Sequence, residues 1–136
     1  MSEAEALAEA ARWFRFATED LRSAEALLRA DEAPPRNACY FAQQAVEKAL
    51  KAVLAFSETD IPRTHDLDAL RLLISDEWAL KRRHPDLATL SEWAVEGRYP
   101  GDWPEATATE ANVAVLQATA ILEAVGADLE VRGLLL

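Results

Sequence analysis

The residues best suited to do chemistry lie in one short stretch, RNACYFAQQAVEKALKA, which spans Arg36–Ala52. Helical spacing gathers an aromatic ring, an amide and two cations on one side of it, beside one carboxylate: Phe41 (or Tyr40), Gln44, Lys48 and Lys51, adjoining Glu47. The chain has a formal net charge of −10, whereas residues 34–56 carry three basic side chains and one acidic one. Such a face is suited to hold an anionic ligand. The commoner alternative is that it is only solvated helix surface.

Gln43, in the same stretch, occupies a position at which an aliphatic residue is expected. It falls within an apolar stripe formed by Cys39, Val46, Leu50 and Val53. We therefore expect Gln43 to be part-buried, where an amide without partners costs about 1–3 kcal/mol. A neighbouring helix end, a water, a second copy or a ligand must take its hydrogen bonds. We favour a structural bond between helices over ligand contact, because most buried polar groups are satisfied by protein.

The elements that position these residues are helices. Glycines and prolines are few (4 and 6), and runs of β-branched residues are absent. The periodicity predicts helices over about 3–30, 36–56, 66–75, 85–97 and 105–130, with Thr64 or Asp66 capping the third. We expect one domain over 1–136 with its core at about 8–130 and a tail, 131–136, that is frayed or packed on a partner. The expected fold is all-α, an up-and-down bundle of four to five antiparallel helices with two long antiparallel pairs and shorter crossing pieces.

Bulk properties exclude several classes of function. The strongly negative charge disfavours non-specific binding to nucleic acid or anionic lipid. We find no apolar run long enough to cross a bilayer, and the N-terminus is acidic, so we expect a cytoplasmic protein that does not bind membranes. The single cysteine, Cys39, cannot form an internal disulfide. No cluster of histidine, cysteine and carboxylates has ligand spacing, so we expect neither metal nor cofactor.

Three segments, taken in order, resemble a known family. The first, ACYFAQQAVEKALKAVL, is similar to the signature ACFxAQQAxEKALKAxL of the HEPN domain (higher eukaryotes and prokaryotes nucleotide-binding). The second is THDLDAL at Thr64–Leu70, and the third is GRYPGDWPEAT at Gly97–Thr107. The likeness spans residues 13–125. It implies a helical bundle that is commonly a homodimer and often the partner of a minimal nucleotidyltransferase.

The same resemblance bears on catalysis. Many HEPN proteins are metal-independent ribonucleases whose motif is arginine, a polar residue, three further residues and histidine. Arg36 and Asn37 match its start, but Phe41 stands where the histidine is expected. Gln43 stands where some toxin members carry a tyrosine that partner enzymes modify. Because a phenyl ring cannot transfer a proton, the resemblance implies that Arg36 and Asn37 hold a phosphate at the helix start without cleaving RNA.

The remaining candidates lie later in the chain. His65, in the THDL segment, is interpreted as a capping-loop residue in preference to a catalytic one, because no second catalytic group is phased with it. We interpret His84 and the basic cluster 81–83 as exposed loop or turn. Tyr99 is expected to bury its ring near the second helix, where Arg98 would meet a carboxylate or, as the second choice, a phosphate.

These observations support three hypotheses. In the first, the chain is a homodimeric, non-catalytic module that binds a nucleotide or a nucleotidyltransferase partner, as in toxin–antitoxin-like pairs. Its ligand would contact Arg36, Asn37, Gln44, Lys48, Lys51 and Arg98, while Gln43, His65 and Tyr99 are structural. In the second, the polar face merely completes a dimer. In the third, the chain is a toxin-type ribonuclease that uses Arg36 and Asn37 with an atypical base such as His65. We rank them in this order, so the sequence leaves enzyme activity open and leans against it.

Overall fold

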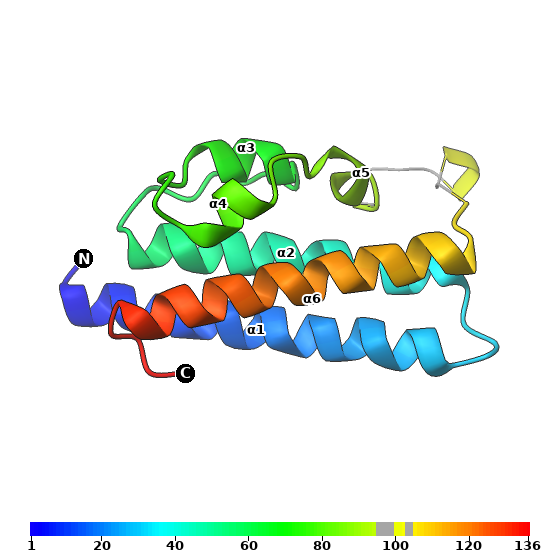
Figure 1. Cartoon of the computed structure of the whole chain (residues 1–136), viewed down its shortest axis with the longest axis horizontal. Coiled ribbons are helices and arrows are strands. Elements are labelled where there is room, and N and C mark those ends of the chain that lie inside the picture. Colours follow the sequence, from blue (N-terminus) through cyan, green and yellow to red (C-terminus); the bar gives the residue numbers. More distant parts are fainter. Residues whose placement is uncertain (95–99, 103–104) are drawn as a thin grey trace.

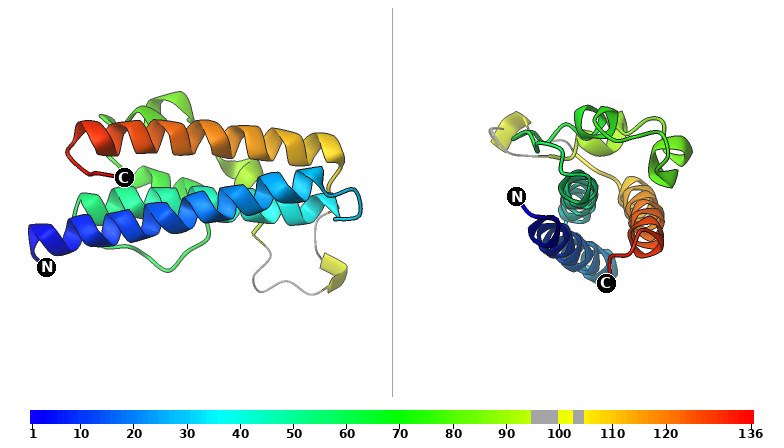
Figure 2. Two further views of the ribbon diagram at one scale, coloured as in Figure 1. Left: turned by 90° about the horizontal axis from the view of Figure 1, so that it is seen from below. Right: turned by 90° about the vertical axis from the view of Figure 1, so that its left-hand side faces the viewer.

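The computed structural model describes residues 1–94, 100–102 and 105–136. This part of the chain is helical, which confirms the predicted all-α class. It comprises α1 (Glu3–Arg29), α2 (Pro35–Phe56), α3 (Leu67–Leu72), α4 (Ala79–Arg83), α5 (Ala88–Ser91), the 3-10 turn η1 (Pro100–Asp102) and α6 (Ala108–Val131). Three of these helices are long and lie side by side (Figure 1; Figure 2). α2 runs antiparallel to α1, and α6 runs in the same direction as α2 (Figure 1).

The expectation of two long antiparallel pairs is wrong, because the chain between α2 and α6 forms only short helices. We call the segment with α3, α4 and α5 the broken third leg of the bundle. α3, α4 and α5 together carry the chain back over α2 and α6 (Figure 1). The helices predicted over 66–75 and 85–97 are shorter than expected. Residues 95–97 lie outside the described part of the chain. α4 was not predicted, and the basic cluster 81–83 belongs to its last turn.

Side chains at the helix ends hold this broken leg together. The Arg71 guanidinium donates to the carbonyls of Lys81 (2.6 Å) and His84 (2.9 Å). Asp128 of α6 accepts from the amide of Ala79 at the start of α4 (2.8 Å). Such bonds satisfy the unpaired backbone groups that helices of four to six residues leave at both ends.

Capping side chains set where the helices begin. Ser2 caps α1, and Asp66, one of the two predicted caps, accepts from two amides of α3. α6 begins three residues later than predicted, because Thr107 and Glu110 form a capping box. α2 differs from these helices. Its N-cap is Pro34, without a side-chain cap bond, and its first turn contains no acidic residue.

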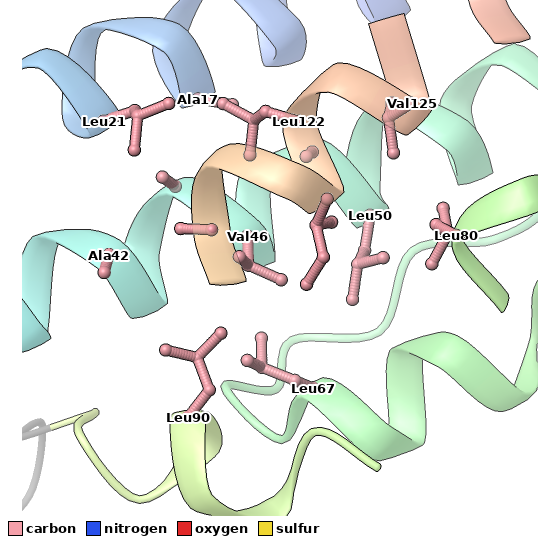
Figure 3. Packing of buried hydrophobic residues seen from close by; sticks show 14 of the residues in the cluster. Ala17, Leu21, Ala42, Val46, Leu50, Leu67, Leu80, Leu90, Leu122 and Val125 are labelled. Carbon is pink, nitrogen blue, oxygen red and sulfur yellow. The ribbon is translucent and has the colours of Figure 1, made fainter. Parts of the chain in front are cut away.

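The core surrounds α2. Its alanine strip at positions 38, 42, 45, 49 and 52 is buried, and α1 packs against α2 with small buried residues of its own such as Ala10 and Ala17. On the opposite side, the larger side chains Val46 and Leu50 lie near three leucines of the broken leg: Leu67, Leu80 and Leu90 (Figure 3). α2 is therefore enclosed between α1, α6 and the short helices.

α6 and the tail that follows it both differ from expectation. Among the described residues, α6 is the one helix long and apolar enough to cross a membrane by length and composition, although none was expected. Its buried residues, such as Ile121 and Val125, face α1 and α2. Beyond α6, Gly133 has a φ of 101°, which turns the chain so that Leu134 is buried in the chain's own core. The tail is therefore packed at Leu134, and not frayed there.

Candidate functional site

A buried ion pair lies at the centre of the candidate site. Glu47 and Lys51 stand one turn apart on α2, 3% and 8% exposed, and Lys51 Nζ donates to Glu47 Oε2 at 3.0 Å. The ammonium group also lies 5.5 Å from the centre of the Trp13 ring on α1. Both contacts compensate the cation for its lost hydration. On the polar face predicted on α2, neighbouring elements thus cover Glu47 and Lys51, whereas Phe41, Gln44 and Lys48 are partly exposed.

The same carboxylate holds a histidine. His65 lies in the loop before α3, and its Nδ1 is 2.7 Å from Glu47 Oε1. With Glu47 ionised, Nδ1 is the donor, which makes Nε2 the acceptor nitrogen of the neutral ring. The imidazole is 40% exposed, whereas the carboxylate that orients it is buried. A carboxylate therefore fixes the orientation of a histidine that remains accessible from solvent.

Gln43 joins this pair to the loop. Its side chain is fully buried, and Nε2 donates to the carbonyl of His65 (3.0 Å) and to Glu47 Oε1 (3.4 Å). Its Oε1 accepts from Gln44 Nε2 at 2.7 Å. Ser91 also donates to the His65 carbonyl and accepts from the amide of Leu67, which ties the loop to the last residue of α5. The structure thus gives Gln43 bonds between α2 and the loop.

We call Gln43, Gln44, Glu47, Lys51 and His65 the polar cluster. Sequence reasoning named all of them except Glu47 as site or structural residues, and it missed that Glu47 bonds three of the others. The spacing of Gln43, Glu47 and Lys51, each four residues from the next, was the available signal, because such residues are neighbours on a helix. Within the described chain, no buried side-chain polar atom lacks a hydrogen-bond partner.

Lys48 lies outside the cluster. Its ammonium group pairs with Asp20 of α1, and the two side chains are 26% and 16% exposed. Lys48 and Lys51, both predicted to contact a ligand, are therefore each paired with a carboxylate of the same chain. Together they still place two cations on one edge of the α1–α2 pair.

Arg36 and Asn37 occupy the first turn of α2. Arg36 is partly exposed and Asn37 is exposed. They precede Gln43 by about two turns, or about 10 Å of helical rise. Phe41, between these two groups, lies edge-on against Tyr40 with ring centres 5.4 Å apart. Arg98 and Tyr99, the remaining candidates, lie outside the described residues.

The other reactive side chains show no sign of activation. Cys39 is buried, and burial together with Glu110 raises its pKa to about 11, which keeps the thiol protonated. Partial burial and the charge of Arg83 lower the pKa of His84, which favours the neutral form of this ring. No three histidine, cysteine or carboxylate side chains in the described segments could hold a metal ion.

Comparisons with known proteins agree with the motifs and the fold. A family profile described as the HEPN domain matches residues 10–129, which is most of the chain. The same comparisons gave no significant match among curated proteins or solved structures. The matched region contains α2, the polar cluster and nearly all of α6. The chain therefore belongs to the HEPN domain family.

Proposed function

We propose that this chain is a non-catalytic nucleotide-binding module. The observation that carries the proposal is the composition of the first turns of α2. They present the guanidinium of Arg36 and the amide of Asn37, followed by Phe41 packed on Tyr40. A guanidinium has only donors, and an amide or a phenyl ring is no proton acceptor, so the turns are suited to bind a phosphate but not to act as a general base.

The local electrostatics favour a phosphate at this position. The start of α2 has no acidic residue in its first turn and no side-chain cap, so the helix dipole favours an anion there. Its backbone contributes little, because Pro34 and Pro35 have no N–H and the amide of Asn37 donates to the Pro34 carbonyl. Arg36 and Asn37 supply directed donors there. Lys48 and Lys51 are paired with Asp20 and Glu47, so we assign them to positioning and to the local potential. Gln44, which is part-buried, is the third contact that we propose.

The partner that we propose follows from the family resemblance. HEPN proteins often accompany a minimal nucleotidyltransferase, which would present the nucleotide to Arg36 and Asn37. Such a protein carries a GSxxxG strand–turn motif and paired aspartates. A neighbouring reading frame that encodes these features would support the pairing.

One observation favours a second function, a metal-independent ribonuclease. The contact of 2.7 Å between His65 and Glu47 has the form of a general base held by an orienting carboxylate. In this alternative, His65 takes the proton of the RNA 2′-hydroxyl while Arg36 stabilises the phosphate. It ranks second because Arg36 and His65 come from separate segments, and Phe41 interrupts the motif that would place a base beside Arg36.

Two measurements on the purified protein separate these functions. Calorimetric titration with ATP, GTP and a short RNA should give saturable binding that Arg36→Ala abolishes. Arg63→Ala, which removes an exposed arginine from the loop before α3, should bind normally. Structured RNA incubated without metal should stay intact. Cleavage lost in both His65→Ala and Glu47→Gln would establish the ribonuclease instead, and absence of both binding and cleavage would refute both functions.

A further inference from the structure

A groove of about 480 Å³ lies between α1 and the segment that follows α6. Beyond α6 the chain turns back beside α1 (Figure 2). Ala11, Phe14 and Thr18 line the groove from α1, and Leu135 and Leu136 line it from the returning segment. We call this space the tail groove. It shares no residue with the polar cluster or with the start of α2.

Two glycines shape the tail groove. A Cβ atom at Gly126 of α6 would lie 3.1 Å from Cζ of Phe14 and 3.8 Å from Cδ1 of Leu136, so a larger side chain there would displace both residues. Gly133 has a φ of 101°, a conformation that side chains disfavour. It turns the chain so that Leu134 is buried and the next two leucines lie beside α1. The apolar part of the groove is therefore fixed by the packing of the bundle.

The apolar surface of the tail groove is open to solvent. Leu135 and Leu136 are 92% and 53% exposed, and Phe14 is partly exposed. Removing such surface from water is favourable, and adjoining exposed apolar side chains commonly mark a binding site. An alkyl chain is the simplest group that would cover these side chains.

The rim of the tail groove is cationic. Its lining includes three exposed arginines, Arg12, Arg15 and Arg22, and one side-chain carboxylate, Glu19, in a chain of net charge −10. Helical spacing would let Glu19 pair with the second or third arginine. In the described part of the chain, however, none of the three forms an ion pair or a hydrogen bond through its side chain. Arg15 contacts the Phe16 ring, 5.2 Å from its centre, so the donors of the rim remain available to an anion.

Helical geometry places two of these arginines nearest the apolar surface. At about 100° per residue, Arg15 and Arg22 lie within about 20° of each other and about 80–100° round the helix from Phe14. Arg12 and Glu19 lie farther round, at about 140–160° from Phe14. Arg15 and Arg22 are about 10 Å apart along the helix axis, so their long side chains can converge on one group between them.

We propose that the tail groove binds a single-chain amphiphile with an anionic head group, such as a medium-chain fatty acid. Its alkyl chain lies against Phe14, Leu135 and Leu136. Arg15 and Arg22 hold the carboxylate, because the planar fork of a guanidinium matches the two oxygens of this group. This inference is independent of the ligand proposed for α2.

Size and charge favour a single amphiphile over a lipid surface. The volume of about 480 Å³ falls within the range of roughly 300–1,000 Å³ that is typical of small-molecule sites. The lining on α1 runs from Ala11 to Arg22, about 16 Å along the helix, which suits one extended chain. An anionic bilayer would meet the field of the whole chain, whose net charge of −10 repels it. A single head group needs only the local excess of cations.

Calorimetric titration of the full chain with dodecanoate, kept below the concentration at which it forms micelles, tests the tail groove. We expect one saturable site. The double variant Arg15→Gln/Arg22→Gln removes both charges and should lower the affinity at least about tenfold. Leu135→Asp places a carboxylate in the groove and should weaken binding to a similar degree, and the exposure of Leu135 means that the variant should fold. Arg63→Gln, outside the groove, is the matched control and should bind normally.

Two analogues and a membrane separate the parts of the ligand. Acetate has the head group without the chain, and dodecyl maltoside has the chain with a neutral head group, so each should bind at least about tenfold more weakly than dodecanoate. Vesicles of phosphatidylcholine and phosphatidylglycerol should not retain the protein in a sedimentation assay. Dodecanoate should raise the melting temperature, because a ligand of the native state stabilises it.

Several outcomes would overturn the proposal. One is the absence of saturable binding up to the concentration at which micelles form, and another is a melting temperature that dodecanoate lowers, as a denaturing detergent does. Affinity that is unchanged in both groove variants, or that falls equally in Arg63→Gln, would show that dodecanoate binds elsewhere or without specificity. Binding that Arg36→Ala abolishes would place dodecanoate at the start of α2. Retention by vesicles without binding of dodecanoate would identify a membrane surface as the ligand instead.

Discussion

The two helices that pack most closely, α1 and α2, differ in whether their charged side chains are buried and bonded. On α2, Glu47 and Lys51 are buried and bonded to each other. On α1, Arg12 and Glu19 are exposed and lie outside every ion pair of the described residues. Both pairs follow helical spacing, so spacing alone does not explain the difference. What differs is coverage: Trp13 and the loop containing His65 lie against the α2 pair, whereas Arg12 and Glu19 remain exposed.

The largest difference between the two regions should appear when a carboxylate is removed from each. Glu47→Ala leaves Lys51 buried without its partner, and we expect the free energy of unfolding to fall by about 3–5 kcal/mol. Glu19→Ala, on the exposed face, should change it by no more than about 0.5 kcal/mol. Urea unfolding at pH 7 and low protein concentration compares the two variants. Equal losses would show that burial does not separate these regions.

Removing the neutral side chain of Gln43 from the polar cluster should give an intermediate loss in the free energy of unfolding. Gln43→Ala removes the bonds to the His65 carbonyl and to Glu47 and leaves a small cavity, so we expect a loss of about 2 kcal/mol. Gln117→Ala on α6, where the amide is only partly buried, is the control and should cost under about 0.5 kcal/mol. Both values come from the same urea titration. A Gln43 loss no greater than the Gln117 loss would contradict the internal role of this amide.

The smallest effect is expected where the two regions meet. Lys48 and Asp20 connect α2 to α1 but remain partly exposed, so their interaction should contribute about 0.5–1 kcal/mol. A double-mutant cycle with Lys48→Ala and Asp20→Ala measures this coupling. The coupling should shrink in 1 M NaCl, at which the Debye length is only about 3 Å. A coupling that does not change with salt, and that is as large as the loss of about 3–5 kcal/mol expected for Glu47→Ala, would instead show that this pair behaves as a buried one.

Sequence periodicity was enough to predict the long helices of this fold. α1, α2 and α6 each present an apolar or alanine stripe over many turns, and their predicted bounds lie within a few residues of those observed. The broken third leg could not be predicted in this way. Helices of four to six residues show too few repeats to reveal a period, and they persist through tertiary bonds such as those of Arg71.

The site was predictable to a similar degree. The interruption of an apolar stripe was sufficient to place Gln43 in a buried position, because that inference needs α2 alone. The burial of Lys51 was not predictable, since it depends on Trp13 in another helix. The bond between Glu47 and His65 depends on a loop eighteen residues further along the chain. Local patterns thus identified the residues, and tertiary packing determined which of them meet.

The broken third leg has a consequence for how the polar cluster moves. Gln43, Glu47 and Lys51 belong to the most enclosed helix, which can lose its hydrogen bonds only when the whole bundle unfolds. His65 belongs to a segment whose nearby helices are one to two turns long. Such a segment detaches at a lower free energy than the long helices do. The contact between Glu47 and His65 therefore joins a part of the bundle that opens last to a part that opens at lower free energy.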